Sequence, residues 1–221
     1  VDLVDTQITN ASIAENSAPN TLIGVLQLAG QSGKPEDIGV TAIGGSAGYH
    51  SLYVMADGSL WGMGLNNYGQ LGDGTTTQRN SPVKILDTGV TQVATGEYHS
   101  LILKSDGSLW TMGYNGNGQL GDGTSSTRKT PVKIMESGVI QIAADHHQSF
   151  FIKEDGSLWG MGYNSHGQLG DGTATHRNTP VMIAENNVVG VSAGYYHTVY
   201  KRKDGVLCVM GRNSEGQLGG G

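Results

Sequence analysis

A segment of this sequence recurs every 49 residues, and this periodicity constrains the fold more than any other feature. The tetrapeptide Gly-Gln-Leu-Gly begins at Gly69, Gly118, Gly167 and Gly216. Asp-Gly pairs keep the same step, at Asp57, Asp106, Asp155 and Asp204, and no insertion or deletion interrupts the register. A repeat of this length predicts similar structural units that stack on one another, each burying a face against its neighbour.

The local signals within one period are those of β-strands. In the second copy, strands are expected at residues 90–95, 100–104, 108–114 and 130–135. The pair Asp106-Gly107 predicts a hairpin turn between the second and third of these strands. Pro131 suits a strand at the edge of a sheet, because proline has no N–H to donate inward. Four strands per period predict an all-β chain that forms a β-propeller of four-stranded blades.

The repeat also divides the chain. Three complete blades and one incomplete blade are expected, at about residues 39–87, 88–136, 137–185 and 186–221. The fourth copy has Cys208 where the others have Trp and Gly220 where they have Asp, and its fourth strand is not included. Residues 1–38 do not share the period, so we expect them to form an extended N-terminal arm or linker.

Two resemblances add to this interpretation. The sequence DGSLW-x-M-G-x-N-x-x-GQLGDGT, which starts at Asp57, Asp106 and Asp155, closely resembles the repeat of the regulator of chromosome condensation family over about residues 39–221. That resemblance implies a propeller, typically of seven blades, that serves as an interaction platform. Residues 13–26 resemble the opening strand and turn of cadherin-like domains in large bacterial surface proteins, which implies a bacterial secreted or cell-surface location.

Composition excludes several classes of function. The formal net charge is −6, from 13 basic and 19 acidic residues, which argues against a nucleic-acid partner because phosphate binding relies on many Lys and Arg. No run approaches 18 apolar residues, so membrane insertion is not expected. The single cysteine, Cys208, excludes an intrachain disulfide and a cysteine-based zinc site.

Polar residues that recur in every copy are expected to be structural. His50, His99 and His197 share one position, where Gln148 stands in the third copy, and this exchange favours hydrogen bonding over metal binding or catalysis. The repeated Asp of each Gly-Asp-Gly-Thr segment is expected to bond its own turn and to pair with the repeated Arg, rather than to bind calcium. The repeated Trp is expected to pack between blades. No catalytic residue, metal site or cofactor is predicted.

Positions that differ between copies are the better candidates for a binding site, because scaffold positions stay alike while exposed positions are free to specialise. They lie in loops or at strand ends and carry the residue types that rigid recognition surfaces favour. The candidates are Tyr68, Glu97, Tyr114, Asn117, His146, Tyr163, His166, Tyr195 and Arg212. The alternative explanation is sequence drift on solvated loops.

These observations favour a non-enzymatic binding module, part of a larger secreted or surface protein, that presents propeller loops to a protein or glycan partner. A second hypothesis is a structural subunit that closes or polymerises by exchanging strands between chains, as a homo-oligomer, with residues 1–28 as the exchanged arm. A third is a guanine-nucleotide exchange activity like that of the family's nuclear founder. It ranks lower because a shared fold does not carry function.

Overall fold

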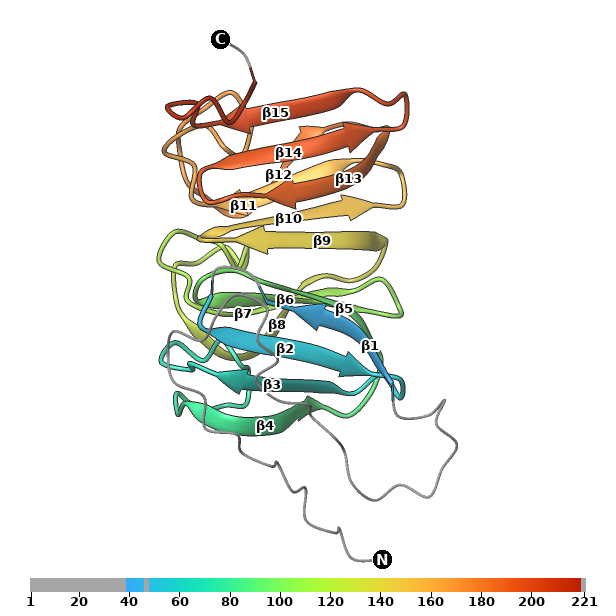
Figure 1. The fold of residues 1–221 in the computed structure, drawn as a ribbon, viewed down its shortest axis with the longest axis vertical. Coiled ribbons are helices and arrows are strands. Elements are labelled where there is room, and N and C mark those ends of the chain that lie inside the picture. The colour runs from blue at the N-terminus through green and yellow to red at the C-terminus, as the bar shows by residue number, and fades with distance from the viewer. Residues whose placement is uncertain (1–38, 46–47, 220–221) are drawn as a thin grey trace, which may run out of the picture. The chain divides into compact units, whose positions relative to one another are not determined.

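In the computed structural model, residues 39–45 and 48–219 are described, and they form fifteen β-strands in four antiparallel sheets (Figure 1). The expected N-terminal arm or linker and the cadherin-like segment lie outside these residues. The strands belong to one compact unit that begins at Val40. Among the described residues, no helix has the length and apolar character needed to cross a membrane.

Each sheet is a meander that keeps the order of the sequence. The first holds β1 (Val40–Gly44), β2 (His50–Met55), β3 (Leu60–Gly64) and β4 (Arg79–Leu86). The second holds β5 (Val90–Thr95), β6 (His99–Lys104), β7 (Leu109–Gly113) and β8 (Arg128–Met135). The third holds β9 (Val139–Asp145), β10 (Gln148–Lys153), β11 (Leu158–Gly162) and β12 (Arg177–Ala184). The fourth holds β13 (Val188–Ala193), β14 (His197–Arg202) and β15 (Leu207–Gly211).

The predicted blades are confirmed, with three sheets of four strands and a fourth sheet of three. In the second copy each strand boundary lies within two residues of its expected position. Pro131 lies in β8, which is the edge strand of its sheet as predicted. The turn after β6 differs in detail, because only Gly107 takes a positive φ, of 76°, and it follows the turn instead of lying at its centre. Its N–H donates to the Lys104 carbonyl at 2.9 Å.

The hydrophobic core lies between successive sheets. Leu52, Leu60 and Leu71 of the first blade pack with Val93, Ile102 and Met112 of the second, and equivalent clusters join the second blade to the third and the third to the fourth. Trp110 and Trp159 are half-buried and pack against the cluster shared with the preceding blade, as expected. Burial of these faces supplies most of the driving force for stacking.

The second glycine of Gly-Gln-Leu-Gly is required by this packing. Gly121 has a φ of +73°, and a Cβ there would lie 2.3 Å from Sδ of Met161 in the following blade. Gly72 and Gly170 face Met112 and Met210 in the same way. Both the left-handed backbone and the close approach therefore favour glycine at this position.

Candidate functional site

The loops that carry the candidate residues gather at one end of each blade. In the second sheet β5 and β7 end on the same side, because β6 runs antiparallel between them. The loop after β5 therefore lies beside the start of the loop after β7. The same arrangement holds in the other blades. It brings all nine sequence-predicted residues to this one end.

At this end, aromatic and histidine rings form a continuous series of contacts across the four blades. Its members, which we call the aromatic face, are Tyr49, Tyr68, Tyr98, Tyr114, His146, His147, Tyr163, His166, Tyr195 and Tyr196. Ring centroids lie 5.0 Å apart for Tyr68 and Tyr114, and 3.8 Å apart for His146 and Tyr195. Arg212 extends the series, with its guanidinium 5.8 Å from the Tyr196 ring.

Seven of the nine predicted residues thus belong to the aromatic face or its ring contacts, and Glu97 adjoins it through two histidines. Asn117 lies in the same loop as Tyr114 but contributes its backbone N–H, which donates to Gln119 Oε1 at 3.0 Å. Sequence reasoning missed four members, namely Tyr49, Tyr98, His147 and Tyr196. They occupy one repeated position, and its near constancy resembled that of a scaffold residue. Its recurring aromatic character on a loop was the signal that could have found it.

The repeat itself holds these loops in place. Gln70 Oε1 accepts a hydrogen bond from the backbone N–H of Tyr68 at 3.0 Å, and Gln168 does the same for His166. Each Gln side chain is fully buried, so the loop has few alternative conformations. The aromatic rings therefore stand on a preorganised backbone, which reduces the entropy lost when a partner binds.

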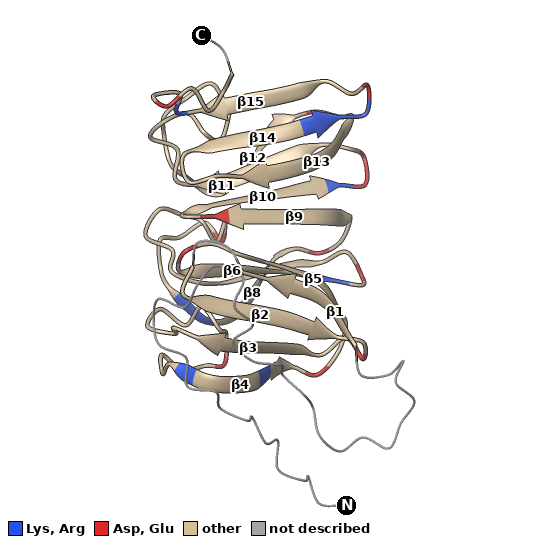
Figure 2. Ribbon diagram, viewed as in Figure 1, with Lys and Arg blue, Asp and Glu red and all other residues tan. Residues whose placement is uncertain are grey.

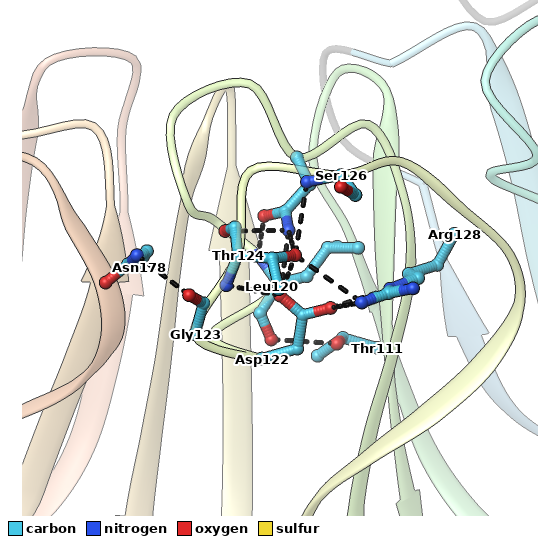
Figure 3. Close-up of polar contacts among 9 residues, drawn as sticks. Thr111, Leu120, Asp122, Gly123, Thr124, Ser126, Arg128 and Asn178 are labelled. Carbon is cyan, nitrogen blue, oxygen red and sulfur yellow. Dashed lines mark hydrogen bonds and ion pairs between the residues drawn. The ribbon is translucent and has the colours of Figure 1, made fainter.

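A network around the repeated Asp fixes the remainder of the loop (Figure 3). Asp122 accepts hydrogen bonds from the backbone and hydroxyl of Thr124, at 3.0 and 2.7 Å, and pairs with Arg128 at 2.6 Å. Burial opposes ionisation of Asp122, but the bonds from Thr124 and Arg128 outweigh it and lower the pKa of this carboxyl. The other two complete copies repeat the arrangement. The predicted turn and Asp–Arg pair are confirmed.

The repeated histidines are also structural. His50 Nε2 lies 2.7 Å from Ser100 Oγ, and that hydroxyl donates to the Gln70 carbonyl at 2.8 Å. Because the serine hydrogen is already used, His50 acts as the donor, and the pair does not have the geometry of a base that activates a nucleophile. Burial lowers the pKa of His50 to about 4. The predicted hydrogen-bonding role is confirmed for His50 and equally for His99.

The third blade departs from the other three at one loop. Where the second and fourth copies have Gly96 and Gly194 and the first has Ala47, it has Asp145. A Cβ on Gly194 would lie 2.2 Å from the His197 ring, so a side chain at this position requires the ring to move, although the first copy combines Ala47 with His50. In the third copy Gln148 replaces the histidine and donates to the Gly194 carbonyl. The exchange of His for Gln thus accompanies a larger, charged residue three positions earlier.

This loop also creates a polar cluster with the second blade. Glu97 Oε2 lies 3.3 Å from His146 Nε2 and 3.9 Å from His147 Nε2. Burial lowers the pKa of both imidazoles, that of His146 to about 4. The hydrogen bond with Glu97 raises the pKa of Tyr98 to about 12. Both histidines are therefore neutral at pH 7 and can act as hydrogen-bond partners or as ligands.

Figure 2 shows Lys and Arg positions distributed over the four sheets, with a run of three, Lys201, Arg202 and Lys203, at the far end of β14 from the aromatic face. Two of the arginines at the end that carries the aromatic face, Arg79 and Arg128, are already paired with aspartates. The face therefore offers a partner aromatic rings, amides and the polar cluster of Glu97, His146 and His147.

Comparison with known proteins shows a clear family signal. The model of the regulator of chromosome condensation (RCC1) repeat matches residues 57–103, 106–152 and 155–200, and a second model of the same repeat matches residues 40–70, 90–119 and 188–217. No curated protein matches the sequence.

Solved propellers of this kind have the same fold. Human WBSCR16 is 26% identical with a TM-score of 0.71, over 86% of this chain and 52% of that protein. Prp20p of Saccharomyces cerevisiae is 22% identical with a TM-score of 0.71, over 82% of this chain and 47% of that protein. The chain thus spans about half the length of the solved structures it matches.

Proposed function

The chain belongs to the regulator of chromosome condensation (RCC1) repeat family, and we propose that its propeller blades act as a non-enzymatic binding module whose aromatic face contacts a partner. The observation that carries this proposal is the unbroken series of ring contacts across four blades. Tyr and Arg are enriched in interfaces, because they bury a large area while losing few rotamers and still offer a polar group.

Two further observations support a recognition role. The loops are fixed by buried side chains, whereas three of the rings are exposed, Tyr49 by 64%, Tyr195 by 46% and Tyr68 by 39%. Exposed aromatic residues in a contiguous group are the usual mark of an interaction surface. The partner is a protein in our proposal, and a glycan is the alternative ligand, because sugar rings also stack on aromatic faces. The expected secreted or cell-surface bacterial location stays a prediction.

Substitution of two exposed rings tests the proposal. Tyr68→Ala and Tyr195→Ala should each weaken partner binding at least about tenfold, as expected for interface hot spots, and leave the melting temperature nearly unchanged. Met182→Ala is the matched control, because Met182 is 50% exposed on β12, away from the aromatic face. Binding is measured by pull-down and by surface plasmon resonance on protein and glycan panels. If both tyrosine variants bind as the control does, the aromatic face is not the binding surface.

The second candidate function, assembly through exposed sheet surface, has one observation in its favour. Leu207 on β15 is 64% exposed, whereas the equivalent Leu60, Leu109 and Leu158 are fully buried by the following blade. Another sheet placed on this surface would bury it in the same way. Light scattering with Leu207→Asp as the variant tests whether that sheet comes from a second copy. A wild-type monomer at every concentration would exclude self-assembly.

The exchange-factor hypothesis has no such support. The likeness to Prp20p, at 22% identity, concerns the fold. An assay of nucleotide release from small GTPases, in which an active module would accelerate release, tests it directly.

A further inference from the structure

The loop of the third blade brings together three potential metal ligands. Glu97, from the loop between β5 and β6, faces His146 and His147, from the loop between β9 and β10. One ligand atom from each residue lies within 4.8 Å of the others. Two imidazoles and a carboxylate form a donor set that Zn²⁺ and related cations accept.

The distances are close to those of a coordinated ion. Zn–N and Zn–O bonds of about 2.0–2.2 Å at tetrahedral angles place two ligand atoms about 3.3–3.5 Å apart. Glu97 Oε2 and His146 Nε2 are 3.3 Å apart, and Glu97 Oε2 and His147 Nε2 are 3.9 Å apart. The ligand atoms of His146 and His147 lie within 4.8 Å of each other, so binding requires side-chain rotation that draws the three atoms around one cation.

The backbone of this loop is strained at a position where its counterparts, Gly48, Glu97 and Tyr195, are not. His146 has a φ of +39°, in the left-handed region that non-glycine residues seldom adopt. Its side chain is 9% exposed, and its Nδ1 is buried without a hydrogen-bond partner. Backbone strain tends to mark positions that serve a function other than stability.

We propose that Glu97, His146 and His147 bind one divalent transition-metal ion of the Zn²⁺ class and thereby join the second and third blades. Three protein ligands leave at least one coordination position free for water or for a donor from a partner. The site shares His146 and His147 with the aromatic face, but a cation can bind there whichever molecule that face recognises.

The contact with Gln119 determines which nitrogen of His147 carries the hydrogen, and therefore whether Nε2 can bind a cation. Gln119 Nε2 lies 3.4 Å from His147 Nδ1, and Gln119 Oε1 is held by the backbone N–H of Asn117. When Gln119 donates to Nδ1, the hydrogen of His147 lies on Nε2, so a cation at Nε2 requires the other tautomer. Gln119→Glu supplies an acceptor for Nδ1–H. It should therefore raise metal affinity about tenfold or more, as carboxylate partners of metal-bound histidines do.

The test uses the full chain without a histidine tag and the metal alone as the ligand. Isothermal titration with ZnCl₂ should show one ion per chain with micromolar or tighter affinity. Co²⁺ should give the visible absorption of a site with nitrogen and oxygen ligands. Glu97→Gln and His147→Asn should each weaken binding at least about tenfold. His166→Asn is the matched control, because this exposed histidine of the aromatic face lies outside the cluster.

The outcomes separate cleanly. Loss of affinity in the two cluster variants, with unchanged affinity in the control, supports the site. Absence of binding by the wild type, or equal affinity in all variants, overturns it. The Co²⁺ spectrum of the wild type answers the question even if one variant does not fold. Because no partner takes part, failure here leaves the proposed binding function untouched.

Discussion

The steric coupling between residues 194 and 197 gives a quantitative prediction. A Cβ on Gly194 would lie 2.2, 2.6 and 2.8 Å from three atoms of the His197 ring, all far below normal contact distances. Gly194 does not have a positive φ, so the backbone itself accepts alanine. Gly194→Ala should therefore lower the free energy of unfolding by overpacking alone, by about 2 kcal/mol.

The third blade indicates which second substitution relieves this overlap. It carries Asp145 where Gly194 stands and Gln148 where His197 stands. His197→Gln alone should change stability by about 0.5 kcal/mol, as substitutions at incompletely buried positions do. In that background Gly194→Ala should have a small effect, so the double-mutant cycle should return a coupling energy of about 1.5 kcal/mol. Urea denaturation of the four proteins measures it.

A matched pair in the second blade sharpens the test. A Cβ on Gly96 would meet the His99 ring at 2.1 Å and also the His146 carbonyl oxygen at 2.8 Å. His99→Gln removes only the first obstacle, so rescue of Gly96→Ala should be incomplete. Equal destabilisation by Gly194→Ala in the wild-type protein and in the His197→Gln variant would refute the steric explanation.

Two further changes test the scaffold. Burial lowers the pKa of His50 from 6.5 to about 4, so the unfolded chain takes up a proton first, and stability should fall by about 3 kcal/mol as the pH drops through this interval. Denaturation midpoints across this range check it, and His50→Gln should reduce the slope. Asp122→Asn removes the pair with Arg128 and should cost about 2 kcal/mol, whereas Glu136→Gln, which breaks only an exposed pair with Lys133, should cost less than about 0.5 kcal/mol in the same assay.

The fold was predictable because each blade is specified by local signals that recur in register. Strand boundaries, the edge position of Pro131 and the pair between Asp122 and Arg128 all follow from turn chemistry or hydrogen-bonding capacity. The contact between Gly121 and Met161 was not predictable, because it joins different blades and depends on how closely they approach.

The site was predictable only in part, for a related reason. Variation between copies identified Glu97 and His146, but not that these equivalent positions touch across adjacent blades. It missed Tyr98 and His147, because a position that is nearly constant looks structural even when its rings face solvent. A position can therefore be constant in a repeat because the scaffold requires it or because every copy contributes it to a binding surface. The sequence alone does not distinguish these two reasons.

A substitution that departs from the repeat is more informative about function when a second, neighbouring position departs from the repeat in the same copy. In the third copy Asp145 and Gln148 change together, whereas the first copy keeps His50 beside the smaller Ala47. Drift on a solvated loop does not require a compensating substitution in the buried interior. The third blade is thus the one in which this loop and the buried scaffold position changed together. It directs attention to the cluster with Glu97 rather than to the many loop positions that vary singly.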